Sequence, residues 1–393
     1  MRLVTGPPGP RVVLDGRPVT VLSSADYLGL ADHPRVREAA ADATLRWGAG
    51  AGPIRPGRAT LLIHHRLQER LAATLRTESA LLAGSGYLAA IAAVCGLGRA
   101  GTTILVDEHV GPALADACRL AHGETVPFHH GDADQVAWEL AGAAGRGPLP
   151  AVVVTESVFA RDGDVAPLLE LCEAARRGRA RLVVDESHAI GCLGPDGRGA
   201  LAEAGLDGEA DVVVCSLGTA LGSCGGMIAG DADVLDEIAH GATALSASAA
   251  PSPAASAAAL AALGLIGDRG RRVAKLQANA GVLRDALAAQ GLAAAASTTH
   301  LMSLDAGDEA AARGMAEAAL AEGVLVEPIG RPLLGAGTAR VQVRVMSSHA
   351  HEELREAAQA LGRAALRAGL AAASDSGVAP APRVFDVEAR AAA

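Results

Sequence analysis

The chain has 393 residues and a formal net charge of −10, and half of its residues are hydrophobic although only 2% are aromatic. The acidic balance argues against nucleic acid or an anionic membrane as the main partner, because both would be repelled. Of the 34 basic residues, only Lys275 is a lysine, and the other basic residues are arginines. Arginine stays protonated and cannot take over the Schiff-base chemistry of a lysine amine.

The six cysteines include no Cys-x-x-Cys pair. We therefore expect buried, reduced thiols rather than disulfides or metal ligands. The start of the chain lacks the features of a signal peptide, and no apolar run reaches the roughly 18 residues of a membrane span. These features predict a cytoplasmic protein without a membrane span.

The predicted elements begin with an N-terminal arm over residues 1–45. A large domain is expected over 46–250, where short apolar runs alternate with helical segments; the runs are 80–83, 103–106, 151–155, 182–184 and 211–216. This alternation predicts an α/β fold with a mainly parallel central sheet and helices on both faces. Near Pro251 the pattern changes to Ala-rich helix. A smaller C-terminal α+β domain is expected over 251–370, and a flexible tail over 371–393.

Two strand ends carry polar groups. The run 182–184 is followed by Asp185 and His188, and the run 211–216 by the glycine-rich stretch 217–226. Ligands of open parallel sheets bind beyond the carboxyl ends of the strands, so these two ends could form the floor of a cofactor site. The alternative is that Asp185 and His188 are a satisfied surface pair.

A third strand end has glycines. The run 80–83 leads into Gly84-Ser85-Gly86-Tyr87 and then into an apolar helix. A strand, a glycine turn and a helix N-terminus suit an anion such as phosphate. A plain tight turn is the other interpretation of this pattern.

Taken together, the motifs make the chain resemble the α-oxoamine synthases, from about Tyr27 to Gly362. These are fold-type-I enzymes that depend on pyridoxal 5′-phosphate (PLP); they include 8-amino-7-oxononanoate synthase, 2-amino-3-ketobutyrate CoA ligase, 5-aminolevulinate synthase and serine palmitoyltransferase. The matching stretches are 27–30, Arg55 with His64, 84–87, 155–159 with 162–164, 185–188 with Gly191, Gly194 and 197–199, 221–226, and 337–340.

The resemblance implies roles for individual residues. Asp185 would keep the ring nitrogen protonated, so that the ring acts as an electron sink. His188 would lie near the ring's phenolic oxygen. The cofactor-binding positions are Ser85, Gly86, Tyr87, Gly111, Ser157, Asp185, His188 and Ser216, and the substrate-binding positions are Arg55, His64 and Gln342.

Departures from the family pattern affect the chemistry. The family lysine, which forms the Schiff base and moves the α-proton, falls at Thr219, and threonine can do neither. The ring-stacking histidine falls at Gly111, with His109 two residues earlier. The carboxylate-gripping arginine falls at Gln342, between Arg340 and Arg344, and a family serine falls at Ala160. Lys275 lies in a charged segment that predicts a solvated helix face.

Several functions stay open on this basis. The first is a degenerate subunit or pseudoenzyme, with PLP non-covalently bound at most, that forms a homodimer or a heterodimer with a lysine-bearing catalytic α-oxoamine synthase. Its substrates would be an amino acid and an acyl-CoA or acyl-carrier protein. The second is an active PLP-dependent acyltransferase, 8-amino-7-oxononanoate synthase-like, or an altered enzyme with reversibly bound cofactor and His188 or His109 as base. The third is a binding or regulatory module. No metal site is expected.

Overall fold

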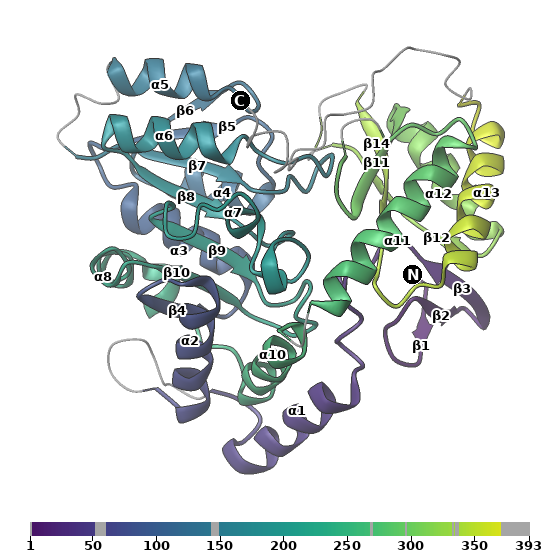
Figure 1. Cartoon of the computed structure of the whole chain (residues 1–393), viewed down its shortest axis with the longest axis horizontal. Coiled ribbons are helices and arrows are strands. Elements are labelled where there is room, and N and C mark those ends of the chain that lie inside the picture. The colour runs from purple at the N-terminus through teal and green to yellow at the C-terminus, as the bar shows by residue number, and fades with distance from the viewer. Residues whose placement is uncertain are drawn as a thin grey trace, which may run out of the picture. The chain divides into compact units, whose positions relative to one another are not determined.

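The computed structural model describes residues 2–51, 60–142, 149–267, 270–294, 297–331, 334 and 338–370 (Figure 1). The chain forms two compact units. The large unit contains His33–Ala160 and Ala166–Gly270. The small unit contains the described residues of Met1–Asp32, Arg161–Val165 and the described chain from Arg271 onward.

A seven-stranded sheet is the centre of the large unit, in the order β4-β10-β9-β8-β7-β5-β6. The strands are β4 (Ser79–Ala83), β5 (Thr103–Asp107), β6 (Glu124–Phe128), β7 (Val152–Glu156), β8 (Arg181–Asp185), β9 (Val212–Ser216) and β10 (Gly226–Gly230). Only β10 runs antiparallel to its neighbours, so the predicted mainly parallel sheet is confirmed. The central strands are continuous aliphatic runs because helices cover both faces of the sheet.

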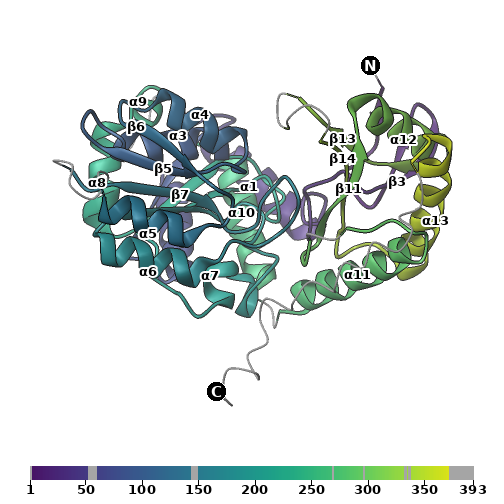
Figure 2. The same ribbon diagram turned by 90° about the horizontal axis from the view of Figure 1, so that it is seen from above.

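Helices cover this sheet on both sides (Figure 2). One face packs against α3 (Gly86–Leu97), α4 (Pro112–Leu120), α8 (Ala232–Gly241) and α9 (Thr243–Ser246). The other face carries α5 (Ala133–Ala141), α6 (Leu168–Gly178) and the short α7 (Ala200–Glu203), which follows the 3-10 turn η2 (Pro195–Gly197). The α3 sequence is almost wholly apolar because most of the helix is buried in this core.

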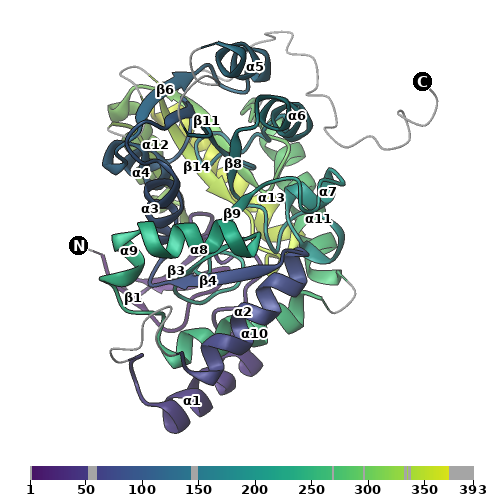
Figure 3. The ribbon, with the colours of Figure 1, turned by 90° about the vertical axis from the view of Figure 1, so that its left-hand side faces the viewer.

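The large unit also includes α1 (Pro34–Trp47), α2 (Leu62–Leu75) and α10 (Pro253–Ile266), which lie side by side (Figure 3). The small side chains of α10 let it pack against both other helices. As a result, the boundaries of the compact units fall after Asp32 and Gly270, where the sequence analysis expected 45 and 250.

The small unit contains two sheets. The first has the order β1-β2-β3-β12, and the second is antiparallel with the order β11-β14-β13. Their strands are β1 (Val4–Thr5), β2 (Arg11–Leu14), β3 (Arg17–Val21), β11 (Leu301–Gly307), β12 (Val324–Leu325), β13 (Glu327–Ile329) and β14 (Ala339–Arg344). Of the helices α11 (Arg271–Ala288), α12 (Glu309–Ala321) and α13 (His351–Arg367), α12 packs against strands of both sheets, and α13 packs against α12 and α11. The expected tail over 371–393 lies outside the described residues.

The segment Arg161–Val165 belongs to the small unit through specific contacts. The Ser303 hydroxyl donates to the Arg161 carbonyl at 2.6 Å, and the Thr299 hydroxyl donates to the Gly163 carbonyl at 2.8 Å. Gly163 has a φ of +75°, and a Cβ there would overlap the Leu301 carbonyl oxygen. Only glycine therefore fits this close approach.

Within the described ranges, no helix is long and apolar enough to cross a membrane.

Candidate functional site

The carboxyl ends of several strands meet at one edge of the large unit's sheet. Glu156 at the end of β7 lies opposite Asp185 at the end of β8. Gly226 at the start of β10 lies opposite both Ser216 and Ala83, the last residues of β9 and β4. We call this edge the floor. It brings together strand ends that are far apart in the sequence, as expected for a ligand site of an open sheet.

Asp185 is held at the floor by Ser187. The Ser187 amide donates to Asp185 Oδ1 at 2.7 Å, and the Ser187 side chain is also hydrogen bonded to the Asp185 carboxylate. The Ser187 hydroxyl accepts from the Ser216 amide at 2.8 Å, which joins the ends of β8 and β9. Burial raises the pKa of Asp185, and the bonds to Ser187 partly oppose this shift. A cationic nitrogen against this carboxylate would favour its ionised form.

The N-terminus of α3 and Ser216 form a cradle for an anion. Ser85 caps the helix, because its hydroxyl accepts from the Leu88 amide at 3.1 Å. Gly86 lies so close to β9 that a Cβ there would be 2.7 Å from Ser216 Cβ and 2.9 Å from Ser216 Cα. The first turn carries no acidic residue. Its amides and the Ser216 hydroxyl are therefore suited to a phosphate group.

Thr219 lies in the turn that follows β9. Its side chain is buried, with the residue 8% exposed, and its Oγ1 donates to the Ser216 carbonyl at 3.0 Å. The floor therefore carries a neutral hydroxyl at this position. The one lysine of the chain, Lys275, belongs to α11 of the small unit and is exposed, on the face opposite the buried Val273, Leu276 and Ala280.

A second carboxyl group, which the sequence analysis did not assign, lies beside Asp185. Glu156 is 5% exposed and accepts from the Gly111 amide at 2.6 Å and the Ala160 amide at 2.7 Å. Burial, with a contribution from Asp185, raises the pKa of Glu156 to about 8. A Cβ on residue 111 would lie 2.7 Å from Glu156 Oε1, so the carboxyl occupies the space where a longer side chain would begin. The sequence feature that could have indicated Glu156 is its position directly after a buried apolar run.

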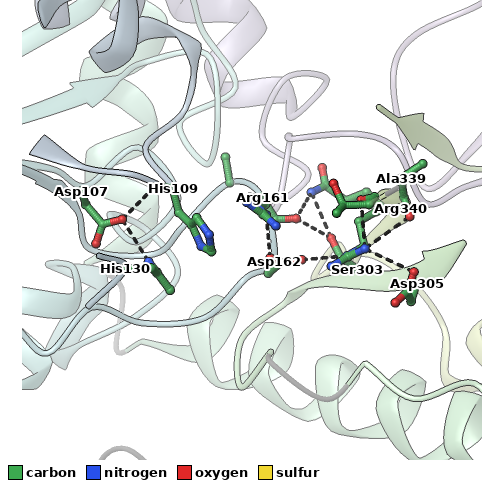
Figure 4. Close-up of polar contacts among 12 residues, drawn as sticks. Asp107, His109, His130, Arg161, Asp162, Ser303, Asp305, Ala339 and Arg340 are labelled. Atoms are coloured by element: carbon green, nitrogen blue, oxygen red, sulfur yellow. Dashed lines mark hydrogen bonds and ion pairs between the residues drawn. The ribbon is translucent and has the colours of Figure 1, made fainter. Parts of the chain in front are cut away.

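His109 and Asp107 belong to a cluster at the end of β5, the strand next to β7 at the same edge of the sheet (Figure 4). Asp107 accepts from His130 Nδ1 at 3.0 Å, from the Gly131 amide at 2.9 Å and from the His109 amide at 2.8 Å. Burial opposes ionisation of Asp107, but these bonds hold its pKa below the usual value. The His109 ring stacks on His130, with 4.1 Å between ring centroids. Its imidazole is therefore engaged with a neighbouring ring.

Three further predicted residues lie near the floor. Ser157 is buried, and its hydroxyl donates to the Asp185 carbonyl at 3.3 Å. His188 lies in the turn directly after β8 and is partly exposed. Tyr87 is 44% exposed, and its hydroxyl donates to Asp116 at 2.7 Å, so its side chain points to α4 while its amide lies in the first turn of α3.

The predicted substrate-binding residues are not gathered there by any described contact. His64 is buried in α2, and its Nε2 donates to the Pro251 carbonyl at 2.9 Å. Burial lowers the pKa of His64. Gln342 belongs to β14 of the small unit, and Arg55 lies outside the described residues.

Gln342 is part of a polar network on β14. It is 1% exposed, its Oε1 accepts from Arg344, and its Nε2 donates to the Arg161 carbonyl at 3.4 Å. Arg344 also pairs with Glu327 at 2.8 Å, and Arg340 pairs with Asp162 at 3.2 Å (Figure 4). Both cations that flank Gln342 are therefore already neutralised by acids.

The cysteines and the possible metal ligands among the described residues do not form a second candidate site. The cysteines are free thiols, of which Cys224 is exposed. Among the described residues, no group of three or more histidines, cysteines or acids is arranged to hold a metal ion.

Comparison with known proteins identifies relatives along most of the chain. A family model described as aminotransferase class I and II matches residues 17–361. An 8-amino-7-oxononanoate synthase of Symbiobacterium thermophilum is 32% identical over 370 residues, which cover 94% of each chain. One of Geobacter sulfurreducens is 35% identical over 374 residues, which cover 94% of this chain and 95% of the relative.

Solved structures share the fold. A Sphingomonas wittichii serine palmitoyltransferase has a TM-score of 0.88 and 24% identity, over 94% of this chain and 93% of its own. A serine palmitoyltransferase from S. paucimobilis, with a lysine replaced by alanine and a bound PLP–myriocin aldimine, has a TM-score of 0.89 and 23% identity over 94% of each chain. The predicted fold type is thus confirmed.

Proposed function

The chain belongs to the class I and II aminotransferase family, among its α-oxoamine synthase-like members, and from this premise we propose that it holds PLP non-covalently and does not catalyse acyl transfer on its own. The family is PLP-dependent. The observation that carries the proposal is Thr219, a buried threonine whose hydroxyl is tied to the backbone at the position of the family lysine. No residue of the large unit has a side-chain amine, because the only lysine of the chain, Lys275, belongs to the small unit.

The floor suits the remaining parts of the cofactor. Asp185 would hold the ring nitrogen, and Ser187 would orient its carboxylate. The first turn of α3 and the Ser216 hydroxyl would hold the phosphate, in the cradle that Gly86 keeps open. When bound, PLP supplies an electron sink for a substrate carbon. A solved structure with this fold, the serine palmitoyltransferase with a lysine replaced by alanine, holds a PLP–myriocin aldimine.

The chemistry that the chain's own residues can perform is limited. Without an amine at residue 219, no group on the floor can bond covalently to the cofactor or move a proton as a lysine does. Glu156 fills the space beside Gly111, and Gln342 is an amide in a neutralised network. We propose that the chain acts as a homodimer, or as the supporting subunit of a lysine-bearing relative that condenses an amino acid with an acyl-CoA or acyl-carrier protein.

A second function is an active 8-amino-7-oxononanoate synthase-like acyltransferase, favoured by the 32% and 35% identity to enzymes of that name.

One experiment separates the non-catalytic function from the active acyltransferase. Purified protein is titrated with PLP, treated with borohydride and analysed by mass spectrometry, because only an imine to the protein is converted to a covalent adduct. Turnover of an amino acid with an acyl-CoA is then measured alone and with a lysine-bearing relative. PLP binding without a covalent adduct on the protein after borohydride, and no turnover alone, support the proposal. Turnover by the unmodified chain alone would overturn it.

A further inference from the structure

Three pieces of backbone come very close together at the cradle. Gly226, the first residue of β10, is the middle residue of a rung that crosses three strands, with Ser216 of β9 on one side and Ala83 of β4 on the other. After Ala83 the chain turns through Gly84 and Ser85 into α3. The start of α3 lies directly against the start of β10.

The closeness of this contact is measured by what a side chain at residue 226 would meet. A Cβ there would be 2.3 Å from the Ser85 carbonyl oxygen and 2.7 Å from the Gly86 amide nitrogen. Cβ atoms essentially never approach other heavy atoms within 3.0 Å, and both neighbours are backbone atoms that cannot rotate away. Any side chain at residue 226 would therefore displace the first turn of α3.

Ser216, the other half of the cradle, is held by other contacts. Its amide donates to the Ser187 hydroxyl at 2.8 Å, and β9 is also paired with β8. Its Oγ accepts from the Gly218 amide at 3.1 Å, so its hydroxyl proton can be donated to an anion. Within the cradle, α3 is thus the part whose position depends on residue 226.

The position of α3 decides how well a phosphate can be bound. The first turn of a helix offers backbone amides that no carbonyl of the helix satisfies. Bonds from such amides to a charged oxygen are short, about 2.7–2.9 Å, and weaken steeply when the distance or the angle departs from its optimum. A displacement of α3 would therefore weaken phosphate binding, whereas the bond between Ser187 and Asp185 at the end of β8 would be unaffected.

We propose that Gly226 makes this site selective for the phosphorylated form of its ligand, as a positioning residue that holds the first turn of α3 beside Ser216. This inference rests on the proposed function, because it concerns the same site. The ring of the ligand would be bound at Asp185 whether or not a phosphate is attached. The selectivity therefore depends on the cradle, and the cradle depends on residue 226.

The test compares two ligands that differ only in the phosphate. Pyridoxine 5′-phosphate and pyridoxine share the ring and its other substituents, and neither has an aldehyde that could react with an amine. Calorimetry on the full chain gives the dissociation constant of the first, and competition gives that of the second. In Gly226→Ala we expect pyridoxine 5′-phosphate to bind about tenfold to a hundredfold more weakly, with little change for pyridoxine, because bonds to a charged group are lost.

Gly230→Ala is the matched control at the other end of the same strand. A Cβ at residue 230 would be 2.2 Å from the Asp211 carbonyl oxygen, so this variant introduces a backbone clash of the same kind away from the cradle. It should lose stability in urea denaturation but keep the preference for the phosphorylated ligand. An unchanged preference in Gly226→Ala, or an equal loss of preference in both variants, would overturn the role of Gly226.

Hydrogen exchange of the unmodified chain gives a second readout, which also decides the proposal if Gly226→Ala does not fold. Pyridoxine 5′-phosphate should slow the exchange of the Gly86 and Tyr87 amides, and pyridoxine should not. Equal protection by both ligands would overturn the selectivity and leave non-covalent binding of the cofactor intact. If the unmodified chain binds neither PLP nor pyridoxine 5′-phosphate, the proposed function fails as well.

Discussion

Glu156 and Asp185 are register partners on adjacent parallel strands, and both end their strands at the floor. Two carboxyls so placed hinder each other's ionisation, which is one reason why the pKa of Glu156 is raised from 4.5 to about 8. The protonation state of Glu156 therefore affects the free energy of unfolding.

The first prediction concerns pH. Because the folded pKa of Glu156 is above its unfolded value, its contribution favours the folded state most at low pH and is lost as pH rises toward 8. The free energy of unfolding should therefore fall with pH between about 4.5 and 8, by up to about 1.4 kcal/mol per pH unit from this group. Urea denaturation across this range should show a smaller slope for Glu156→Gln. Glu38→Gln, on the exposed face of α1, is the matched control and should leave the slope as it is. An unchanged slope in Glu156→Gln would contradict this role.

The second prediction concerns the missing amine. With PLP and borohydride, Thr219→Lys should give a covalent adduct on residue 219 that mass spectrometry detects, since it restores an amine on an otherwise intact floor. Turnover should stay low, because we expect Gly111 and Gln342 to stand at the positions of the family's ring-stacking and carboxylate-binding groups, which they cannot replace. The control is the unmodified chain, in which Lys275 should give no such species. Mass spectrometry that finds a reduced adduct on Lys275 at full occupancy would refute the interpretation.

Ser187 is the subject of the third prediction. Its hydroxyl joins Asp185 to the Ser216 amide, so Ser187→Ala should weaken binding of the cofactor by about threefold to tenfold, through the loss of one or two hydrogen bonds. Binding should also weaken more steeply as pH falls, because Asp185 loses a bond that favours its ionised form. Ser187→Thr keeps the hydroxyl and should restore both properties. Identical affinity and pH dependence in Ser187→Ala would exclude this positioning role.

The fourth prediction concerns the close approach of α3 to β9. A methyl group at Gly86 would meet Ser216 Cβ at 2.7 Å, so Gly86→Ala should open the cradle, reduce cofactor affinity and cost about 1–3 kcal/mol of stability. The control is Gly264→Ala in α10, where a Cβ meets no atom within 4 Å. That variant should gain roughly 0.5–1 kcal/mol from helix propensity. Thermal and chemical denaturation compare the two. Equal stability of both variants would contradict the packing described.

Much of the fold follows from local sequence patterns. Buried strands such as β7 and β8 are uninterrupted aliphatic runs, and their polar ends identified Asp185. β6 escaped prediction because it contains Pro127 and polar residues, which its position at the sheet edge tolerates. β10 escaped prediction because it begins and ends with glycine, which is depleted in strands. The placement of α10 in the large unit could not be predicted, because an Ala-rich helix has no clear apolar face.

The candidate site was predictable only where it is local. Ser85, Gly86, Ser216 and Thr219 lie at the end of a strand or within a few residues after it, so their patterns can be recognised in the sequence. The contact of Glu156 with Gly111 joins residues 45 positions apart, through loops whose path no short motif determines. The sequence shows that residue 111 is a glycine without a side chain, but only the fold shows that the Glu156 carboxyl fills the space beside it.

The small unit is assembled from three pieces of chain, and this affects the order of folding during synthesis. Thr20 and Val21 of β3 pair with Val324 and Leu325 of β12, about three hundred residues later. The large unit has all its residues once Gly270 has left the ribosome, whereas the N-terminal strands must wait for nearly the whole chain. Contacts of such long range are slow to form, so the large unit should fold first and the small unit should close around the two earlier segments at the end.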